Sequence, residues 1–423
     1  MKTLKNLSLL AFASVLIWSC GSDPENLMVS SITATGTSFE DGSALTSDLN
    51  GSASAEDVAL DAVITVTFDK EVDATTVNTS NVKIADADGN DVALTATGSG
   101  SSITIDPTED FARGTNYTLT VNNVLAADEG PLTSLSRTFK TEGRAPVVPP
   151  HVDDQVLYIP FNGSTEDVTG NYSIANEIAF SLTDDRFGQG ASAGLFDGDE
   201  TIVEIADAMS LTATDDFTIS FWINSDGSDV NADGATRGQF VMGLAGWHGF
   251  QFEIFGDYGG AKLASTYSLA DGTTASQDLW WSTQGNLGWM GWTFDQDISA
   301  AGGLRALIEG QWTHFVVSYD AATKIGAIYV NGELRKSQDF NLYGDTHPLY
   351  NATGMGYAGN DAPGDRLALG FIQGSENAVI ADDWANPIGF PDNNHFKGGM
   401  DDVRFFKASF TADDVAELYN AEK

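Results

Sequence analysis

Side chains alternate between apolar and polar along residues 217–224, and this period of two constrains the fold more than any other feature. One face of the segment would carry Phe217, Ile219, Phe221 and Ile223, and the other Thr218, Ser220, Trp222 and Asn224. The pattern indicates a β-strand with one face in a hydrophobic core. It recurs over residues 313–319, and a later apolar run leads into the turn signal Asn331-Gly332. Repeated short strands with turn-rich connections predict an all-β protein that contains a two-sheet sandwich.

Short motifs then follow one another in a recognisable order between residues 161 and 404. They are Phe161-Asn-Gly163, Phe187-Gly-Gln-Gly190, Phe196-Asp-Gly198, Phe217-Thr-Ile-Ser-Phe-Trp222, Gln311-Trp-Thr-His-Phe315, Tyr329-Val-Asn-Gly-Glu333 and Met400-Asp-Asp-Val-Arg404. Together they resemble a laminin-G-like, concanavalin A-like jelly roll of bacterial surface proteins, which we place at residues 153–423. Because that family is mostly carbohydrate-binding and includes some glycosidases, the resemblance implies the fold more firmly than the activity.

A smaller β domain is predicted at residues 56–142. Residues 63–68 alternate, and further strand-like runs follow at the spacing of a sandwich. The segments Phe68-Asp-Lys-Glu-Val-Asp73, Gly114-Thr-Asn-Tyr117 and Thr138-Phe-Lys-Thr141 resemble a bacterial Ig-like domain of the S-layer type, which implies a spacer. We expect a flexible tether at residues 20–55, with the start of a strand near residues 28–35. We also expect a proline-rich linker at residues 143–152 and a short C-terminal helix capped by Thr411.

The chain begins with a basic segment and a short apolar run that end at its single cysteine. This run is too short to span a membrane, so residues 1–19 are predicted to be a signal peptide. The segment resembles a bacterial lipoprotein signal, which implies lipidation of Cys20; an ordinary secretory peptide with an incidental cysteine is the alternative. Residues 21–25 resemble an acidic export signal, so the expected location is the outer membrane, anchored by lipid and facing the cell exterior.

The charge of the chain restricts its partners. With 60 acidic and 20 basic residues, the formal net charge is −40. Nucleic acids and anionic lipids are bound through Lys and Arg, so we expect no nucleic-acid partner and no membrane contact besides the lipid anchor. A strongly anionic polysaccharide is disfavoured for the same reason, and a neutral one fits best.

Tryptophans cluster in the stretch 277–300, which we interpret as an insertion between sandwich strands. Trp280 and Trp281 are adjacent, so in an extended segment they face opposite ways, and one of them must leave the core. Indole rings stack on the flat C–H faces of sugars. The predicted glycan-binding residues are Trp280, Trp281, Trp289, Trp292, Trp247, His248, Tyr258 and Trp384, with Tyr267 as a further wall residue. The alternative is that these rings pack the insertion onto the sandwich, and Trp222 and Trp312 are expected to be structural.

A structural calcium ion is the one cofactor that we expect. By resemblance to laminin-G-like sandwiches, Asp401 would hold it together with Asn162, and Asp197 is a weaker candidate for a further ligand. A second, weaker candidate is the loop with Asp229, Asn231 and Asp233, which opens like an EF-hand loop but has Phe240 at the twelfth position instead of glutamate. A solvated turn is the alternative for this loop.

Catalytic motifs are not apparent in the sequence. The Glu-x-Asp-x-x-Glu strand of sandwich glucanases and the Gly-x-Ser-x-Gly elbow are missing, and the histidines show no zinc spacing. We therefore expect a non-catalytic surface lipoprotein that captures a polysaccharide for an uptake system, alongside a glycan transporter and glycosidases. The alternatives are a polysaccharide hydrolase or lyase on the same fold, and an adhesive or structural envelope protein.

Overall fold

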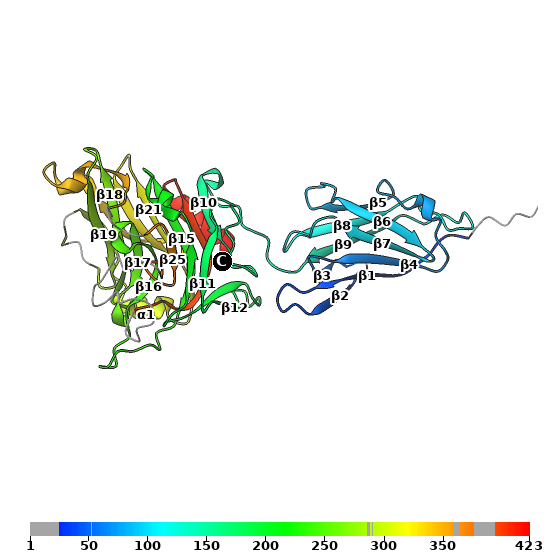
Figure 1. Cartoon of the computed structure of the whole chain (residues 1–423), viewed down its shortest axis with the longest axis horizontal. Helices are drawn as coiled ribbons and strands as arrows, with labels where there is room; N and C mark the ends of the chain where they lie inside the picture. Colours follow the sequence, from blue (N-terminus) through cyan, green and yellow to red (C-terminus); the bar gives the residue numbers. More distant parts are fainter. Residues whose placement is uncertain (1–24, 52, 286–287, 290, 359–363, 376–393) are drawn as a thin grey trace, which may run out of the picture. The chain divides into compact units, whose positions relative to one another are not determined.

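The structure, a computed structural model, describes residues 25–423 except 52, 286–287, 290, 359–363 and 376–393. The chain forms two compact units (Figure 1). The first comprises the chain up to Ser38 and Ser43–Ala145, and the second comprises Phe39–Gly42 and Pro146–Lys423. Within the described residues, no helix has the length and apolar character needed to cross a membrane.

The first unit is a sandwich of two sheets, with strand orders β2-β1-β4-β7-β6 and β3-β9-β8-β5. Its strands are β1 (Val29–Thr37), β2 (Ala44–Asp48), β3 (Ala55–Val58), β4 (Val63–Phe68), β5 (Val82–Asp86), β6 (Leu94–Ser99), β7 (Ser102–Pro107), β8 (Asn116–Val121) and β9 (Leu135–Thr141). The alternation predicted for β4 is confirmed, because Ile64, Val66 and Phe68 are buried and the residues between them are half-buried.

The expected tether over residues 20–55 is wrong for most of its described part, whereas the strand expected near residues 28–35 is present as β1. Strand β1 pairs along its length with the central strand β4, and β2 pairs with β1 on the other side. Ile32 and Ala34 point into the core, which holds β1 in the sheet. Short apolar runs separated by Ser and Thr suggested a tether, but Thr suits a half-buried strand equally well.

The second unit is a larger sandwich. One sheet has the strand order β12-β13-β26-β15-β21-β22-β23-β20, with β10 also paired to β26; the other has the order β11-β14-β25-β16-β17-β18-β19, with β24 also paired to β18. The strands are β10 (Gln155–Ile159), β11 (Ile174–Ile178), β12 (Ser181–Thr183), β13 (Ala193–Asp197), β14 (Ile202–Ile205), β15 (Phe217–Ser225), β16 (Gln239–Leu244), β17 (Phe250–Ile254), β18 (Gly260–Leu269), β19 (Thr274–Ser282), β20 (Trp292–Asp295), β21 (Trp312–Asp320), β22 (Ile325–Val330), β23 (Glu333–Asp339), β24 (Ala352–Met355), β25 (Leu367–Leu369) and β26 (Lys397–Phe406).

Among the described residues of this unit, two α-helices accompany the sheets, α1 (Gly303–Ile308) and α2 (Ala412–Glu422). The Thr411 side chain caps α2 by accepting a hydrogen bond from the N–H of Asp414, while the Asp414 carboxylate accepts one from the N–H of Thr411. Val415 and Leu418 are buried against the outer face of the sheet that contains β15 and β21. The predicted all-β fold with a short C-terminal helix is confirmed.

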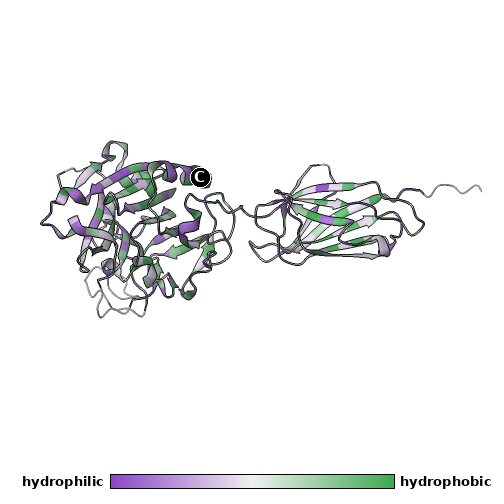
Figure 2. Cartoon of the chain, turned by 90° about the horizontal axis from the view of Figure 1, so that it is seen from above, coloured by the Kyte–Doolittle hydropathy of each residue, from purple (hydrophilic) through white to green (hydrophobic). Residues whose placement is uncertain are grey.

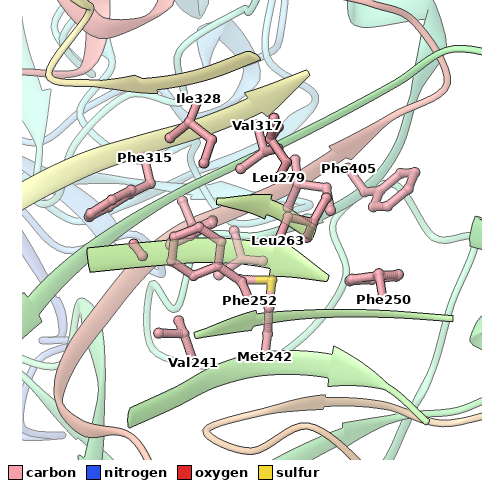
Figure 3. Packing of buried hydrophobic residues seen from close by; sticks show 14 of the residues in the cluster. Val241, Met242, Phe250, Phe252, Leu263, Leu279, Phe315, Val317, Ile328 and Phe405 are labelled. Atoms are coloured by element: carbon pink, nitrogen blue, oxygen red, sulfur yellow. The ribbon is translucent and has the colours of Figure 1, made fainter. Parts of the chain in front are cut away.

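The main core lies between the two sheets of the second unit. Phe221 stacks on Phe315 with ring centroids 5.7 Å apart, and Phe252 from the opposite sheet meets Phe315 edge to face at 5.3 Å. Figure 3 shows the side chains that fill this space. Apolar and polar residues interleave along the strands (Figure 2), as expected for sheets with one face in a core.

Strand register determines what the outer face of the second sheet presents. On β17 the residues Phe250 and Phe252 are in the core, so the intervening Gln251 and the following Glu253 point outward. Gln251 is opposite Ala264 on β18, and Ala264 is opposite Asp278 on β19. A row of polar and small side chains therefore crosses the outer face.

Candidate functional site

A pocket of about 560 Å³ lies on this outer face. Four tryptophans contribute to its wall, and the rest of its lining is small or polar: it consists of Trp247, Trp280, Trp289, Trp292, Ala264, Ser265, Ser276, Gln277 and Asp278. We call it the tryptophan pocket. Concave sites of this size with aromatic walls and a few polar groups are typical of small-ligand binding.

Strand β19 supplies one wall and part of the floor. Its alternation places Ser276, Asp278 and Trp280 on the outer face, and Leu279 and Trp281 in the core. The neighbouring strand β18 contributes Ala264 to the floor of the pocket. Its side chain is smaller than those of the surrounding lining residues, so the surface is recessed at this point. The depth of the pocket thus follows from one small residue placed between two strands.

The indole of Trp280 is held by two aromatic neighbours. Trp292 meets it at a centroid distance of 5.7 Å and an interplanar angle of 82°, and Phe255 meets it at 5.9 Å and 64°. The Trp280 side chain nevertheless stays 38% exposed. Edge-to-face contacts of this kind fix a ring without burying it completely.

Trp289 and Trp247 complete the exposed part of the wall. Trp289 is 60% exposed, and its side chain hydrogen-bonds the hydroxyl of Tyr343. The turn beyond it needs glycine, since Gly291 has φ +81° and an added Cβ would lie 2.6 Å from the Tyr343 ring. Trp247 stacks on the imidazole of His248 with ring centroids 4.1 Å apart.

A buried ion pair lies against the ring of Trp292. The Nζ atom of Lys336 lies 3.2 Å from the centroid of the Trp292 ring and 3.2 Å from Oδ2 of Asp295. Burial lowers the pKa of Lys336 to about 8, although Asp295 opposes the shift. Trp292 Nε1 is buried without a hydrogen-bond partner in the part of the chain that the structure describes.

A chain of polar contacts runs beside the pocket. Lys262 Nζ lies 3.0 Å from Oε1 of Glu253 and 3.0 Å from Oδ2 of Asp278, and Gln251 Nε2 donates to Glu253 Oε2 at 3.1 Å. Burial raises the pKa of Glu253, partly offset by Lys262. Burial alone would lower the pKa of Lys262, but the two carboxylates raise it above its usual value. The ammonium group of Lys262 is therefore charged, and both of these carboxylates already bind it.

The structure brings together four of the predicted tryptophans, Trp247, Trp280, Trp289 and Trp292, while His248 stacks on Trp247 and does not line the pocket. Trp281, Tyr258 and Tyr267 were predicted wrongly as wall residues, because all three are buried in the core. Trp384 lies outside the described residues, as does Cys20.

The stretch 277–300 is also not an insertion. Residues up to Ser282 belong to the regular strand β19, and Trp292 begins the strand β20. Lys262, Ala264 and Asp278 were missed as site residues. The alternation on β18 could have shown Lys262 and Ala264 on one face, but it could not show which strand would lie beside them.

The calcium ligands predicted from the resemblance do not fit one site. Asp197 is opposite Lys397, four residues before Asp401 on β26, which is about 13 Å along a strand. Calcium holds its ligands at about 2.3–2.6 Å. Asp401 forms a buried ion pair with Arg186, and Asp197 Oδ1 accepts the backbone N–H groups of residues 199–201. Asn162 therefore cannot complete a shared site with both acids.

The second calcium candidate has the internal hydrogen bonds of a turn. Asn231 Oδ1 accepts the N–H groups of Asp233 and Ala235, and Asp229 lies 3.8 Å from Arg237. Among the residues that the structure describes, no group of three or more His, Cys, Asp or Glu side chains is arranged to hold a metal ion. Calcium binding through other groups stays a prediction.

His314 and Trp222 are structural. His314 is completely buried, its Nε2 lies 2.8 Å from Ser220 Oγ, and burial lowers its pKa to about 3. Trp222 stacks on His314 beneath α2, and its Nε1 donates to Glu422 Oε2 at 2.7 Å. Helix α2 therefore covers the outer face that Trp222 could have offered to a ligand.

Residues 47–141 match the bacterial Ig-like domain family, and residues 267–376 match the concanavalin A-like lectin/glucanases superfamily. The predicted order of the two domains is confirmed, whereas the lipoprotein signal stays a prediction. The sequence matches none of the curated proteins with which it was compared.

Several solved structures are similar to the chain at low identity. The binding domain of botulinum neurotoxin serotype D/C VPI 5993 is 15% identical with a TM-score of 0.41, and covers 64% of this chain and 53% of its own. The receptor-binding domain of botulinum neurotoxin type G is 13% identical with a TM-score of 0.38, covering 63% and 51%. The chain thus spans about half the length of the structures it matches.

Proposed function

Because the chain contains a bacterial Ig-like domain followed by a concanavalin A-like domain, we propose that it is a surface protein that binds a neutral polysaccharide in the tryptophan pocket. The observation that carries this proposal is the exposure of several indoles around one pocket. Trp247, Trp280 and Trp289 are each at least one-third exposed although they are large and apolar. Single exposed apolar side chains are common, but several that gather around one pocket are typical of an interaction site.

Sugars match this surface chemically. Their C–H faces stack on indole rings, and their hydroxyl groups need hydrogen-bond partners at the edge of the stack. Asp278 and Gln277 lie in the lining, where their polar atoms can bind these hydroxyl groups. The pocket therefore offers both the apolar faces and the polar edge that a sugar ring requires.

The charges beside the pocket favour a neutral sugar. Lys262 lies next to the lining, and both Glu253 and Asp278 already bind its ammonium group. Lys336, which lies against the ring of Trp292, is paired with Asp295. The half-exposed Asp278 would repel a uronate or sulfate group placed in the pocket. The formal net charge of −40 acts in the same direction.

A glycan-array screen of the protein comprising residues 25–423, which includes both described units, tests this function. We expect binding to one class of neutral polysaccharide, and weaker binding of the same polysaccharide by the Trp280→Ala and Trp289→Ala variants. Phe294→Ala is the matched control, because Phe294 is an exposed aromatic residue on β20 outside the pocket lining. Array signals as strong as those of the native protein in both tryptophan variants would contradict the proposal.

One observation favours a hydrolase as the second candidate. Glu253 Oε1 and Asp278 Oδ2 each lie 3.0 Å from the same Nζ atom, so they are no more than about 6 Å apart, close to the spacing in retaining glycosidases. The raised pKa of Glu253 is also typical of a general acid. Reducing-end assays on the bound polysaccharide separate the two functions: release that is lost in Glu253→Gln indicates hydrolysis, and no release indicates capture.

The expected surroundings of the protein complete the proposal. We propose that lipid on Cys20 anchors the chain in the outer membrane, that the Ig-like domain acts as a spacer, and that captured chains pass to a transporter and to glycosidases. Metabolic labelling with a radioactive fatty acid tests the anchor. Label that is present in the native chain and missing in Cys20→Ser is expected, whereas equal labelling of both would contradict lipidation at this residue.

A further inference from the structure

We infer that the tryptophan pocket holds a run of sugar residues on two separate stacking positions, so its ligand is an oligosaccharide segment rather than a single sugar. The inference rests on the proposed function and specifies the length of ligand that the same site requires. One stacking position is Trp247, and the other is formed by Trp280 and Trp289.

The two positions are anchored at different points along the same strand pair. Thr266 Oγ1 donates to the carbonyl oxygen of Trp247 at 2.8 Å, and Thr266 is opposite Ser276 on β19. Trp280 is opposite Lys262. The two anchoring points are therefore four residues apart, which corresponds to about 13 Å along a strand. A single pyranose ring, similar in size to the six-membered ring of an indole, cannot cover both positions.

The floor between the two positions suits a sugar that is bound by its edge. Ala264 is opposite Asp278, midway between the two anchoring points. The small side chain of Ala264 leaves space above the floor of the pocket at this point. Lys262 holds Oδ2 of Asp278, which fixes the carboxylate while the side chain stays half exposed. A sugar between the two stacked residues can therefore donate hydroxyl hydrogen bonds to Asp278.

Both stacking positions are held in place within the protein. Trp247 is stacked on His248, and Trp280 is held edge to face by Trp292 and Phe255. Rings that are fixed before binding lose little conformational freedom when the ligand arrives. Each position should therefore add its contribution to affinity as soon as the ligand is long enough to reach it.

Calorimetric titration of residues 25–423 with neutral gluco-, xylo- and manno-oligosaccharides, from the disaccharide to the hexasaccharide, tests the inference. For the series that binds, we expect affinity to rise with length until both positions are occupied, and then to level off. Trp247→Ala should lower the affinity for the long members about fivefold and leave the short members unchanged. Phe294→Ala should change neither.

A second variant keeps the test independent of the stability of the Trp247 variant. Ala264→Leu places a larger side chain on the floor between the two positions. It should therefore lower the affinity for the longer oligosaccharides and leave the affinity for the disaccharide unchanged. Equal affinity for the disaccharide and the hexasaccharide in the native protein would overturn the two-position site but leave glycan binding intact. No binding of any series would overturn the proposed function together with the inference that rests on it.

Discussion

The indole of Trp280 meets the indole of Trp292 edge to face, with ring centroids 5.7 Å apart. The two residues come from different sheets, because Trp280 is on the edge strand β19 and Trp292 is on the edge strand β20. Their contact joins the two sheets at one edge of the sandwich and forms the wall of the tryptophan pocket. The wall is thus part of the packed structure, and its position does not depend on a loop alone.

Trp280→Ala and Trp289→Ala should each weaken polysaccharide binding about five- to tenfold, since each removes one stacking surface. Trp280→Ala should have the larger effect, because Trp280 also supports Trp292. Affinity electrophoresis with the polysaccharide identified on the array gives the ratio. Equal retardation of the native protein and both variants would contradict the assignment of these rings to the site.

Lys336→Met should weaken binding about two- to fivefold, although Lys336 does not line the pocket. Its ammonium group lies on the face of Trp292, so its removal loosens the ring that supports Trp280. Because the pKa of Lys336 is lowered to about 8, the ammonium group loses its proton as the pH rises through that value.

The pH dependence separates this positioning role from a general loss of stability. Native binding should weaken between pH 7 and 9, whereas binding by Lys336→Met should stay constant over the same range. Lys324→Met is the matched control, because Lys324 lies over the ring of Tyr350 away from the pocket. A parallel decline in the native protein and in Lys336→Met would exclude Lys336 as the group responsible.

Arg186→Met should destabilise the second unit by about 3–5 kcal/mol, because it removes the cation that pairs with two buried carboxylates. Those carboxylates are Asp401 and Asp402, and both are completely buried. Tryptophan fluorescence during urea unfolding reports on this unit, since every tryptophan after Trp18 lies in it. Arg305→Met, which removes a partly exposed ion pair with Glu309, should cost less than about 1 kcal/mol.

His314 should make the second unit sensitive to acid. Its folded pKa of about 3 lies below its usual 6.5, so the neutral form is favoured by folding and stability is lost as the pH falls below 6.5. Between pH 7 and 5 this loss amounts to about 2 kcal/mol. The stability advantage of the native protein over His314→Gln should shrink by that amount in urea unfolding. An advantage that does not change with pH would contradict the assignment.

The period-two pattern was sufficient to predict the strands of the core. Phe217, Ile219, Phe221 and Ile223 are all buried, and adjacent Trp280 and Trp281 face opposite ways as expected. The sequence could not indicate which of these two indoles would be the exposed one. That choice depends on the pairing of β18 with β19, which places Trp281 opposite Ala261 and in the core.

Contacts between residues distant in the sequence also explain the other differences between the predictions and the structure. The apolar residues near 28–35 indicate the start of a strand, but the full strand over residues 29–37 depends on pairing with β4, which the local sequence does not specify. Asp401 was expected to bind metal, but Arg186, which is distant in the sequence, reaches it in the folded protein. Lys262 and Asp278 belong to the site through register across β18 and β19, which a single sequence does not specify.

Acrylamide quenching of tryptophan fluorescence tests the central claim most directly, with and without the polysaccharide identified on the array. Trp247, Trp280 and Trp289 are the exposed tryptophans among the described residues, whereas Trp222 and Trp281 are buried. If sugar rings cover the tryptophan pocket, saturating polysaccharide should lower the quenching constant of the native protein and leave that of the Trp280→Ala/Trp289→Ala variant nearly unchanged. A quenching constant that stays the same in the saturated native protein would contradict binding at these indoles.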